Sequence, residues 1–292
     1  MHVHATRETR GPRRACSVTS IGVLATSHNR CSTTIDAIAS VLEAAKRAQV
    51  GITFYLVDAG STDGTVDQVK AAFPQVVLEE LGDNVFWGAG MSRAGVLAQR
   101  GDHDYHLWLN DDVVLNQDGV ERILATSREN PRAVVVGQLV DDLQTPTYGG
   151  FRRGTGLRRM RFENVGVALD VQTCDSLNGN VVLVPKVVIS AIGGVDSAFP
   201  HAFGDIDYGL RARGAGFAVV QPAGVVGRCS RNPEWRPNGG PWSRLRQVSS
   251  VKRLPFRAWW TFCRRHGGIL APVFFAKPYL RAMVGPRRSV SR

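Results

Sequence analysis

The chain has 292 residues, of which 43% are hydrophobic and 21% are charged. This balance excludes a disordered chain and fits a globular protein large enough to bury a substantial core. The formal net charge of +11 predicts anionic partners, namely nucleotide phosphates, nucleic acid or an acidic membrane surface, without choosing among them.

The five cysteines are scattered and lack the CxxC spacing of a zinc site or a redox motif, which favours a reducing compartment. Basic residues at the start are followed by no apolar stretch, so residues 1–17 are predicted to be a disordered arm and not a signal peptide. No apolar run approaches the roughly 20 residues needed to cross a bilayer. We expect a cytoplasmic protein, with peripheral attachment to the inner face of the cytoplasmic membrane as an alternative.

The first half of the chain alternates strands and helices. Four apolar runs predict buried strands, at residues 18–25, 52–57, 76–81 and 105–109. Apolar residues at helical spacing predict the helices between them, the first of which Thr33 or Thr34 is expected to cap. This rhythm predicts an α/β fold with a mostly parallel central sheet flanked by helices. Ligands bind such sheets beyond the carboxyl ends of the strands.

The pattern changes after residue 140. Residues 147–160 are rich in Gly and Arg, and we expect a loop there that crosses the site or the surface. A strand over residues 181–184 and a helix over residues 205–215 follow. The predicted organisation is a disordered arm (1–17), an α/β domain (18–226) and a basic, aromatic, helical or irregular extension (227–292).

An acidic pair follows the strand at residues 105–109, in the sequence Asn110-Asp111-Asp112. Adjacent carboxylates at the end of an apolar strand are costly unless a cation or a pair of ribose hydroxyls compensates them. Mg²⁺ or Mn²⁺ bridging a diphosphate uses one or two carboxylates in this way. The alternative is a turn in which Asp caps a helix, and the sequence leaves both open.

Three more aspartates occupy informative positions. Asp58 ends the second predicted strand, where a carboxylate can accept from a base imide or a ribose hydroxyl, whereas Asp63 is expected to cap the next helix. Asp205 opens the helix at residues 205–215 and is a candidate general base for an acceptor hydroxyl. The helix N-terminus is expected to hold its pKa low. We assign Asp207 to structure, because Asp207 and Arg211 can pair at i,i+4 spacing.

Two glycine-containing turns leave alternatives open. Gly88 precedes a helix and either cradles phosphate or serves packing. Gly179 lies in Asn-Gly-Asn, which either holds sugar hydroxyls or turns the chain into the next strand. A Ser-His-Asp nucleophilic set has no support, because the chain lacks a GxSxG elbow.

Four stretches together resemble the family 2 glycosyltransferases, which have the Rossmann-like A-type glycosyltransferase fold. Residues 26–30 (TSHNR) are similar to the family's T-x-[HY]-N-R loop, and residues 57–65 (VDAGSTDGT) to its V-D-N-G-S-T-D-G-T. Residues 109–113 (LNDDV) are similar to its DxD metal motif, and residues 204–216 to E-D-x-D-L-x-L-R-x-R-x-x-G. The subgroup that the chain resembles most contains rhamnosyltransferase-like enzymes of bacterial surface polysaccharides.

This resemblance implies a metal-dependent inverting transferase that moves a sugar from a UDP-, GDP- or dTDP-linked donor to a saccharide or lipid-linked acceptor. Asp112 would bind Mn²⁺ or Mg²⁺, Asp111 the metal or the ribose, and Asp205 would deprotonate the acceptor. One base and one metal-held leaving group permit a single in-line displacement. The nucleotide sugar is expected to contact Thr26, His28, Asn29, Arg30, Asp58, Asn84, Gly88, Asn110, Asp111 and Gly179.

Two departures from the family pattern are visible. Gly204 stands where the family has Glu, and residues 225–228 lack the family's His, so Arg228 is expected to supply positive charge instead. A catalytically silent sugar-nucleotide-binding protein and a basic nucleic-acid-binding protein stay open as alternatives, although no nucleic-acid-binding module is recognisable and no nucleic acid is expected as a partner. Residues 254–265 either rest on an anionic membrane surface or pack their aromatic side chains on the α/β domain.

Overall fold

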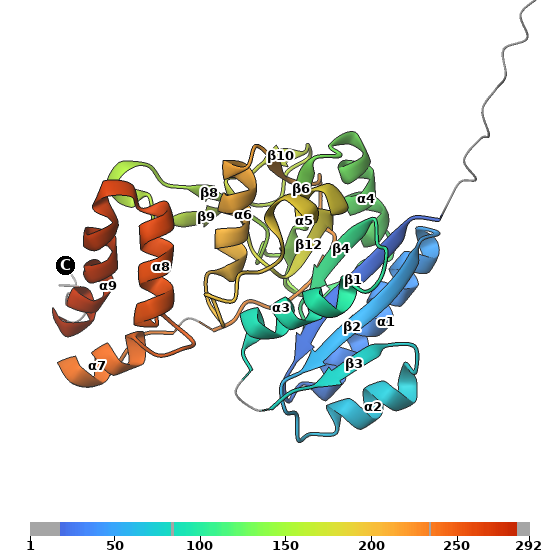
Figure 1. Cartoon of the computed structure of the whole chain (residues 1–292), viewed down its shortest axis with the longest axis horizontal. Helices are drawn as coiled ribbons and strands as arrows, with labels where there is room; N and C mark the ends of the chain where they lie inside the picture. Colours follow the sequence, from blue (N-terminus) through green and yellow to red (C-terminus); the bar gives the residue numbers. More distant parts are fainter. Residues whose placement is uncertain (1–17, 83–84, 234, 285–292) are drawn as a thin grey trace, which may run out of the picture.

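A computed structural model describes residues 18–82, 85–233 and 235–284 of the chain. Its centre is a sheet of eight strands (Figure 1), which are in chain order β1 (Ser20–Ser27), β2 (Gly51–Asp58), β3 (Val77–Glu80), β4 (Tyr105–Leu109), β6 (Ala133–Val136), β10 (Gln172–Thr173), β12 (Val181–Pro185) and β13 (Ala218–Gln221).

The strands of this sheet lie in the order β10-β13-β6-β12-β4-β1-β2-β3. The neighbours β3, β2, β1 and β4 are parallel to one another, as are β6 and β13. β12 runs antiparallel between β4 and β6, and β10 runs antiparallel at the edge. The α/β prediction is confirmed, with an antiparallel strand inserted beside β4 that matters for the site.

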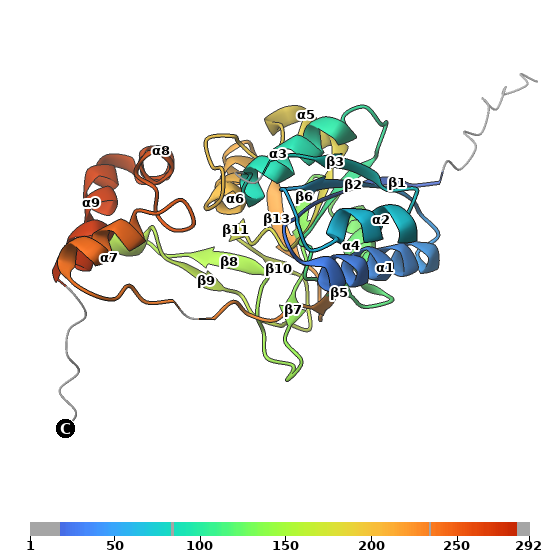
Figure 2. The same cartoon turned by 90° about the horizontal axis from the view of Figure 1, so that it is seen from below.

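Helices cover both faces of the sheet (Figure 2). One face carries α1 (Cys31–Arg47), α2 (Thr65–Ala72) and α4 (Gly119–Glu129), and the other carries α3 (Trp87–Ala98), α5 (Lys186–Ile192) and α6 (Gly204–Gly214). Successive side chains of a strand point to opposite faces, so a sheet covered on both sides needs strands that are apolar throughout. The buried strands of this chain have that composition.

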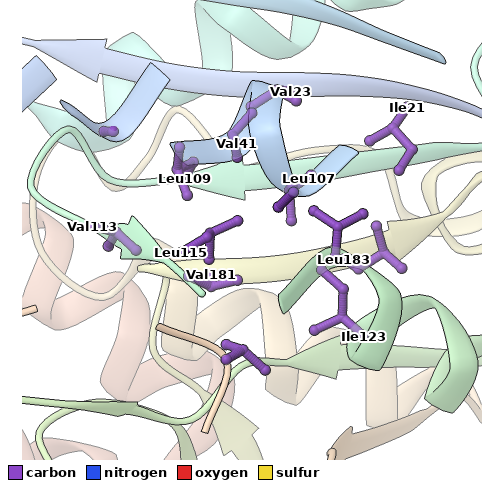
Figure 3. Packing of buried hydrophobic residues seen from close by; sticks show 14 of the residues in the cluster. Ile21, Val23, Val41, Leu107, Leu109, Val113, Leu115, Ile123, Val181 and Leu183 are labelled. Carbon is purple, nitrogen blue, oxygen red and sulfur yellow. The ribbon is translucent and has the colours of Figure 1, made fainter. Parts of the chain in front are cut away.

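The two core layers follow from this alternation. Ile21 and Val23 of β1 pack with Val41 of α1 and Ile123 of α4 (Figure 3), whereas Leu24 of the same strand belongs to the opposite layer, with residues of α3, α5 and α6. The burial of both layers fixes the register of the central strands, and therefore fixes where their polar carboxyl ends lie.

Asp63 joins the beginnings of two helices. Its Oδ2 accepts the backbone N–H of Cys31 (2.9 Å), the first residue of α1, and its Oδ1 accepts the backbone N–H of Thr65 (3.1 Å), the first residue of α2. The Asp63 carboxylate thus accepts from the start of α2 as a cap would, although the residue directly before that helix is Gly64. The expected cap at Thr33 or Thr34 is wrong, because α1 already begins at Cys31. The backbone N–H of Cys31 is satisfied by Asp63 from another loop.

Two small sheets flank the carboxyl edge of the large one. One has the order β5 (Val114–Leu115), β14 (Gly227–Arg228), β7 (Leu139–Val140), and the other has the order β11 (Ser176–Leu177), β8 (Gly150–Arg153), β9 (Phe162–Asn164). The expected loop at residues 147–160 therefore contains β8, followed by the 3₁₀ turn η1 (Gly156–Arg158). The residues of β8 do not alternate between buried and exposed. The sequence therefore lacks the alternating pattern that would have predicted this strand.

The extension forms a helical layer beyond α6, with α7 (Pro241–Val248), α8 (Phe256–His266), the 3₁₀ turn η2 (Gly268–Leu270) and α9 (Ala271–Val284) (Figure 1). Trp259 and Phe262 of α8 are buried in its core, which also contains Phe199 from the segment before α6. Two aromatic side chains of residues 254–265 thus pack on the protein, as one alternative predicted, whereas Phe256 and Trp260 are 50% and 40% exposed. Within the described residues, no helix has the length and apolar character needed to span a bilayer.

Candidate active site

The carboxyl ends of β1, β2 and β4 border a cavity of about 630 Å³. β1 and β4 are neighbours although β2 and β3 lie between them in the chain, and such a switch point is where sheets of this kind open a crevice. β12 pairs Val181 with Leu109 of β4, which brings the turn before β12 to the same place. The predicted residues that line the cavity are Thr26, His28, Arg30, Asn110, Asp111, Asp112, Gly179 and Asp205.

The acidic pair converges on Arg30. Nη1 of Arg30 lies 3.1 Å from Oδ1 of Asp111 and 2.6 Å from Oδ2 of Asp112. Burial raises the pKa of Asp111 to about 6, although the Arg30 guanidinium opposes the shift. The next helix, α4, begins only at Gly119, so the helix-cap alternative for this pair is wrong. Both carboxylates are arranged around a positive charge.

Carboxylate oxygens of this kind fit a hard divalent cation. Among the residues that the structure describes, no group of three or more His, Cys, Asp or Glu side chains gathers in the geometry of a metal site. An ion held by Asp111 and Asp112 would complete its coordination with water and substrate oxygens, which is the usual arrangement for Mg²⁺ between a protein and a phosphate chain.

The turn before β12 forms the wall between the acidic pair and α6. Oδ1 of Asn110 accepts the Nε1–H of Trp87 (2.7 Å), and its amide group donates to Asn180. A Cβ at Gly179 would lie 2.5 Å from the Trp87 ring and 3.2 Å from Cβ of Asp205. Only a glycine fits between these two side chains, so Gly179 sets how closely Trp87 approaches Asp205.

Asp205 lies in the first turn of α6 and faces the cavity. Its Oδ1 accepts the backbone N–H of Ile206 (2.8 Å), and its Oδ2 accepts that of Gly179 (3.0 Å). Desolvation nevertheless raises the pKa of Asp205. The expectation that the helix N-terminus holds this pKa low is wrong, because loss of water around the carboxylate outweighs its backbone hydrogen bonds. A raised pKa makes the group a better proton acceptor.

Asp58 is buried and does not line the cavity. The residue is 1% exposed. Its Oδ2 accepts the hydroxyls of Ser27 (2.8 Å) and Ser61 (2.6 Å), and its Oδ1 accepts the Ser61 backbone N–H (2.7 Å). The expected contact between Asp58 and a base or ribose therefore has no support in this geometry, because the carboxylate is used to tie the ends of β1 and β2 together.

Asn29 and His28 also connect these two loops. Asn29 has a φ of 51°, a left-handed conformation that Asn tolerates better than most residues, and its Oδ1 accepts the Thr62 backbone N–H (2.8 Å). Nδ1 of His28 donates to the carbonyl of Ala59 (2.8 Å). His28 lines the cavity, whereas Asn29 does not line it and instead stabilises the loop through its bond to Thr62. Asn84, also expected at the site, lies outside the described residues.

Gly88 is likewise not in the cavity wall. A Cβ on Gly88 would lie 2.0 Å from the carbonyl oxygen of Phe199, and the next N–H group, that of Ala89, donates to the Pro200 carbonyl (3.1 Å). The start of α3 is thus packed against protein backbone. This geometry favours the packing alternative for Gly88 over the phosphate cradle.

We expect Gly88→Ala to lower the free energy of unfolding by about 2 kcal/mol, because an added methyl group in a well-packed place forces the backbone to shift. Gly82→Ala is the matched control, since a Cβ there would meet nothing within 4 Å. Denaturant unfolding of both variants measures the difference. Equal stability of the two would contradict the close contact with Phe199.

The family model described as "Glycosyl transferase family 2" matches residues 23–176, which is more than half of the chain. The chain belongs to glycosyltransferase family 2. This match does not favour a silent binding protein or a nucleic-acid-binding protein.

This family 2 glycosyltransferase is also similar to one characterised relative and to one solved structure. N-acetylglucosaminyl-diphospho-decaprenol L-rhamnosyltransferase of Mycobacterium tuberculosis, from two strains, is 24% identical over 196 residues, which are 58% of this chain and 63% of the relative. The chain thus spans less than two thirds of the relative's length. The solved structure of the mannosyltransferase PcManGT from Pyrobaculum calidifontis, in complex with GDP-Man and Mn2+, covers 92% of this chain and 73% of its own, with a TM-score of 0.54 and 13% identity. This similarity confirms the A-type fold.

Two residues that the sequence did not predict, Cys229 and Lys252, lie beside or in the wall of the glycosyltransferase cavity. Arg228 was expected to supply charge, but its Nη1 lies 4.0 Å from Oδ1 of Asp142 and it does not line the cavity. Its neighbour Cys229 instead places Sγ 3.5 Å from Oδ1 of Asp112. Cys229 itself does not line the cavity, whereas Lys252, from the extension, does. Both arrive through long-range packing, so no local pattern could have revealed them.

Proposed function

We propose that this family 2 glycosyltransferase moves a sugar from a nucleotide-sugar donor to an acceptor hydroxyl and inverts the anomeric configuration. The observation that carries the proposal is the presence of two distinct acidic groups in one cavity. Asp111 and Asp112 form a pair suited to a cation, and Asp205 is a single, desolvated carboxylate suited to accept a proton. A cation that stabilises the diphosphate leaving group and a base that takes the hydroxyl proton each assist the displacement of a diphosphate by a hydroxyl.

We assign Asp111 and Asp112 to hold Mn²⁺ or Mg²⁺, which would stabilise the charge of the diphosphate leaving group. Arg30 neutralises both carboxylates in this structure, and its side chain is 44% exposed, so it has room to turn toward the diphosphate. The Mn2+ and GDP-Man named for the structurally similar mannosyltransferase support this assignment.

Asp205 acts in our proposal as the general base. It accepts the proton of the acceptor hydroxyl while the hydroxyl oxygen attacks the anomeric carbon and the bond to the diphosphate breaks. Two backbone N–H groups hold the carboxylate in place and still leave lone pairs for the hydroxyl. A single displacement with one base requires no covalent intermediate and inverts the anomeric centre.

We further propose that residues 18–226 form the catalytic domain and that the extension forms the acceptor side. The acceptor named for the mycobacterial relative carries a diphospho-decaprenol group, which supports a lipid-linked acceptor and a role in polysaccharide or glycolipid synthesis. We propose a UDP-, GDP- or dTDP-linked donor.

Thermal shifts with these three donor classes test the nucleotide end of the site. A donor at about 100 times its Kd is expected to stabilise the protein by about 2.7 kcal/mol, and the shift is expected to need Mn²⁺ or Mg²⁺. Asp112→Asn should lose the part of the donor-induced thermal shift that depends on the metal. Asp142→Asn, which replaces a carboxylate that is 83% exposed, should keep it. A shift that no metal changes would contradict the assignment of the acidic pair.

A further inference from the structure

A second hollow lies beside the catalytic cavity, on the helical extension. It has a volume of about 920 Å³ and runs between α7, α9 and the segment before α6. Ala202, Phe203 and Lys252 line both this hollow and the catalytic cavity. We call it the junction groove, because the two spaces meet at these three residues.

The lining of the junction groove is apolar and basic. Trp235, Val248, Leu254 and Ala282 supply apolar surface, and every charged residue among the described residues of the lining is Arg or Lys. A groove of this composition suits a molecule that is both hydrophobic and anionic. The nucleotide of a donor matches it less well, because a nucleotide lacks a long apolar portion.

The basic residues of the junction groove differ in the contacts that they make. Arg244 donates to the carbonyls of Ala282 (2.6 Å) and Met283 (2.8 Å) and so closes the end of α9. Arg253 lies 4.2 Å from the ring centre of Trp235. Within the described chain the side chains of Lys252 and Arg281 form no hydrogen bond or ion pair, and of these two only Lys252 lines both spaces. It is the lining cation best placed to meet an anionic group that reaches toward Asp205.

Phe203 fixes the shape of the junction. It has a φ of 73° and directly precedes α6, a left-handed conformation that is costly for an aromatic residue and persists only where the surroundings impose it. Its ring lies 5.1 Å from those of both Trp259 and Phe262 of α8. The extension therefore fixes the position of Phe203, which lines both the catalytic cavity and the junction groove.

We propose that the junction groove binds the lipid-diphosphate portion of the acceptor, with the phosphates at Lys252 and the hydrocarbon chain along Trp235, Val248 and Leu254. The sugar at the other end of the phosphates would then enter the catalytic cavity toward Asp205. This inference rests on the proposed transferase function and adds to it the place where the acceptor lies.

Farnesyl diphosphate is a water-soluble probe for this groove, and Trp235 allows its binding to be followed by intrinsic fluorescence in the full-length protein without added metal. Binding is expected, with Lys252→Glu weakening the affinity at least tenfold. Arg257→Glu is the matched control, because Arg257 is an exposed cation of α8 that lines neither space, and it should stay within twofold of the wild type. Farnesol and inorganic pyrophosphate should each bind more weakly than farnesyl diphosphate.

The proposal would be overturned if farnesyl diphosphate did not bind. It would also be overturned if Lys252→Glu and Arg257→Glu weakened the affinity for farnesyl diphosphate equally. It would also fail if vesicles of phosphatidylglycerol, and not farnesyl diphosphate, responded to Lys252→Glu, because the groove would then be a membrane contact. Wild-type thermal shifts with donor and Mn²⁺ separate the two levels. If the donor shifts the melting temperature but farnesyl diphosphate does not bind, only the proposal for the junction groove is contradicted. If the donor causes no shift, the transferase proposal is contradicted.

Discussion

Asp205→Asn is expected to lower the turnover of sugar transfer by about 10²- to 10⁴-fold, which is the usual contribution of a general base. An amide cannot take up the acceptor proton, but it occupies the same volume beside Gly179. The affinity for the donor is expected to stay within about twofold, since the acidic pair at Asp111 and Asp112 is unchanged. Initial rates with saturating donor and a binding isotherm measure the two quantities.

Asp67→Asn is the matched control for this change. Asp67 is also an acid in the first turn of a helix, α2, but it is exposed and lies outside the cavity. Its replacement should leave turnover unchanged. The amide introduced by Asp205→Asn has one oxygen, which can replace only one of the two carboxylate oxygens that accept backbone N–H bonds, so unfolding curves are needed to establish that this variant is folded. Undiminished turnover in a folded Asp205→Asn protein would remove Asp205 from the mechanism.

Asp207→Asn is expected to lower the free energy of unfolding by about 3 kcal/mol, as loss of one partner from a buried charged cluster does. The Asp207 side chain has no exposed surface. Its Oδ2 accepts from Nε of Arg211 (2.7 Å), and its Oδ1 accepts from Nε2 of His266 (2.9 Å) and Nη1 of Arg265 (3.2 Å). This carboxylate joins α6 to α8, so its loss should also loosen the extension.

Asp118→Asn provides the control with the same local geometry. Asp118 and Arg122 of α4 form an i,i+4 pair at 2.7 Å, and Asp207 and Arg211 form one at the same distance. The Asp118 side chain is 32% exposed, so the cost of its replacement should stay below about 1 kcal/mol. Equal costs for the two variants, measured by denaturant unfolding, would contradict a special role of the buried cluster.

The same cluster predicts a dependence on pH. Although burial alone would raise the pKa of Asp207, the hydrogen bonds from His266 and Arg211 outweigh it and leave the pKa below its ordinary value of 3.8. A carboxylate with a lowered pKa in the folded state contributes stability above its unfolded pKa, and that contribution is lost as the pH falls through the folded pKa. The stability difference between wild type and Asp207→Asn should therefore shrink in acid below about pH 4.

The location of the site could be predicted because it depends on local patterns. Buried strands are apolar throughout, so the positions of Asn110 and Asp111 at a strand end are visible in the sequence, and parallel neighbours bring such ends together. The burial of Asp58 could not be predicted, since an acid at a strand end looks the same whether it binds a ligand or the hydroxyls of Ser27 and Ser61.

The parts that sequence reasoning missed depend on contacts between distant segments. The choice between packing and phosphate binding for Gly88 depends on a backbone carbonyl of Phe199, and Lys252 reaches the cavity from the extension. The pKa of Asp205 was misjudged for the same reason, because desolvation depends on all the segments that enclose the group and not on its helix alone.

The anomeric configuration of the product tests the central claim most directly. A farnesyl-diphospho-sugar acceptor, a nucleotide-sugar donor and Mn²⁺ can be incubated with the protein, and the new glycosidic bond examined by NMR. We expect a glycosylated acceptor whose new linkage has the configuration opposite to that of the donor, and at least about a hundredfold slower formation of that product with Asp205→Asn. A product that keeps the donor configuration, or one formed equally by the Asp205→Asn protein, would contradict it.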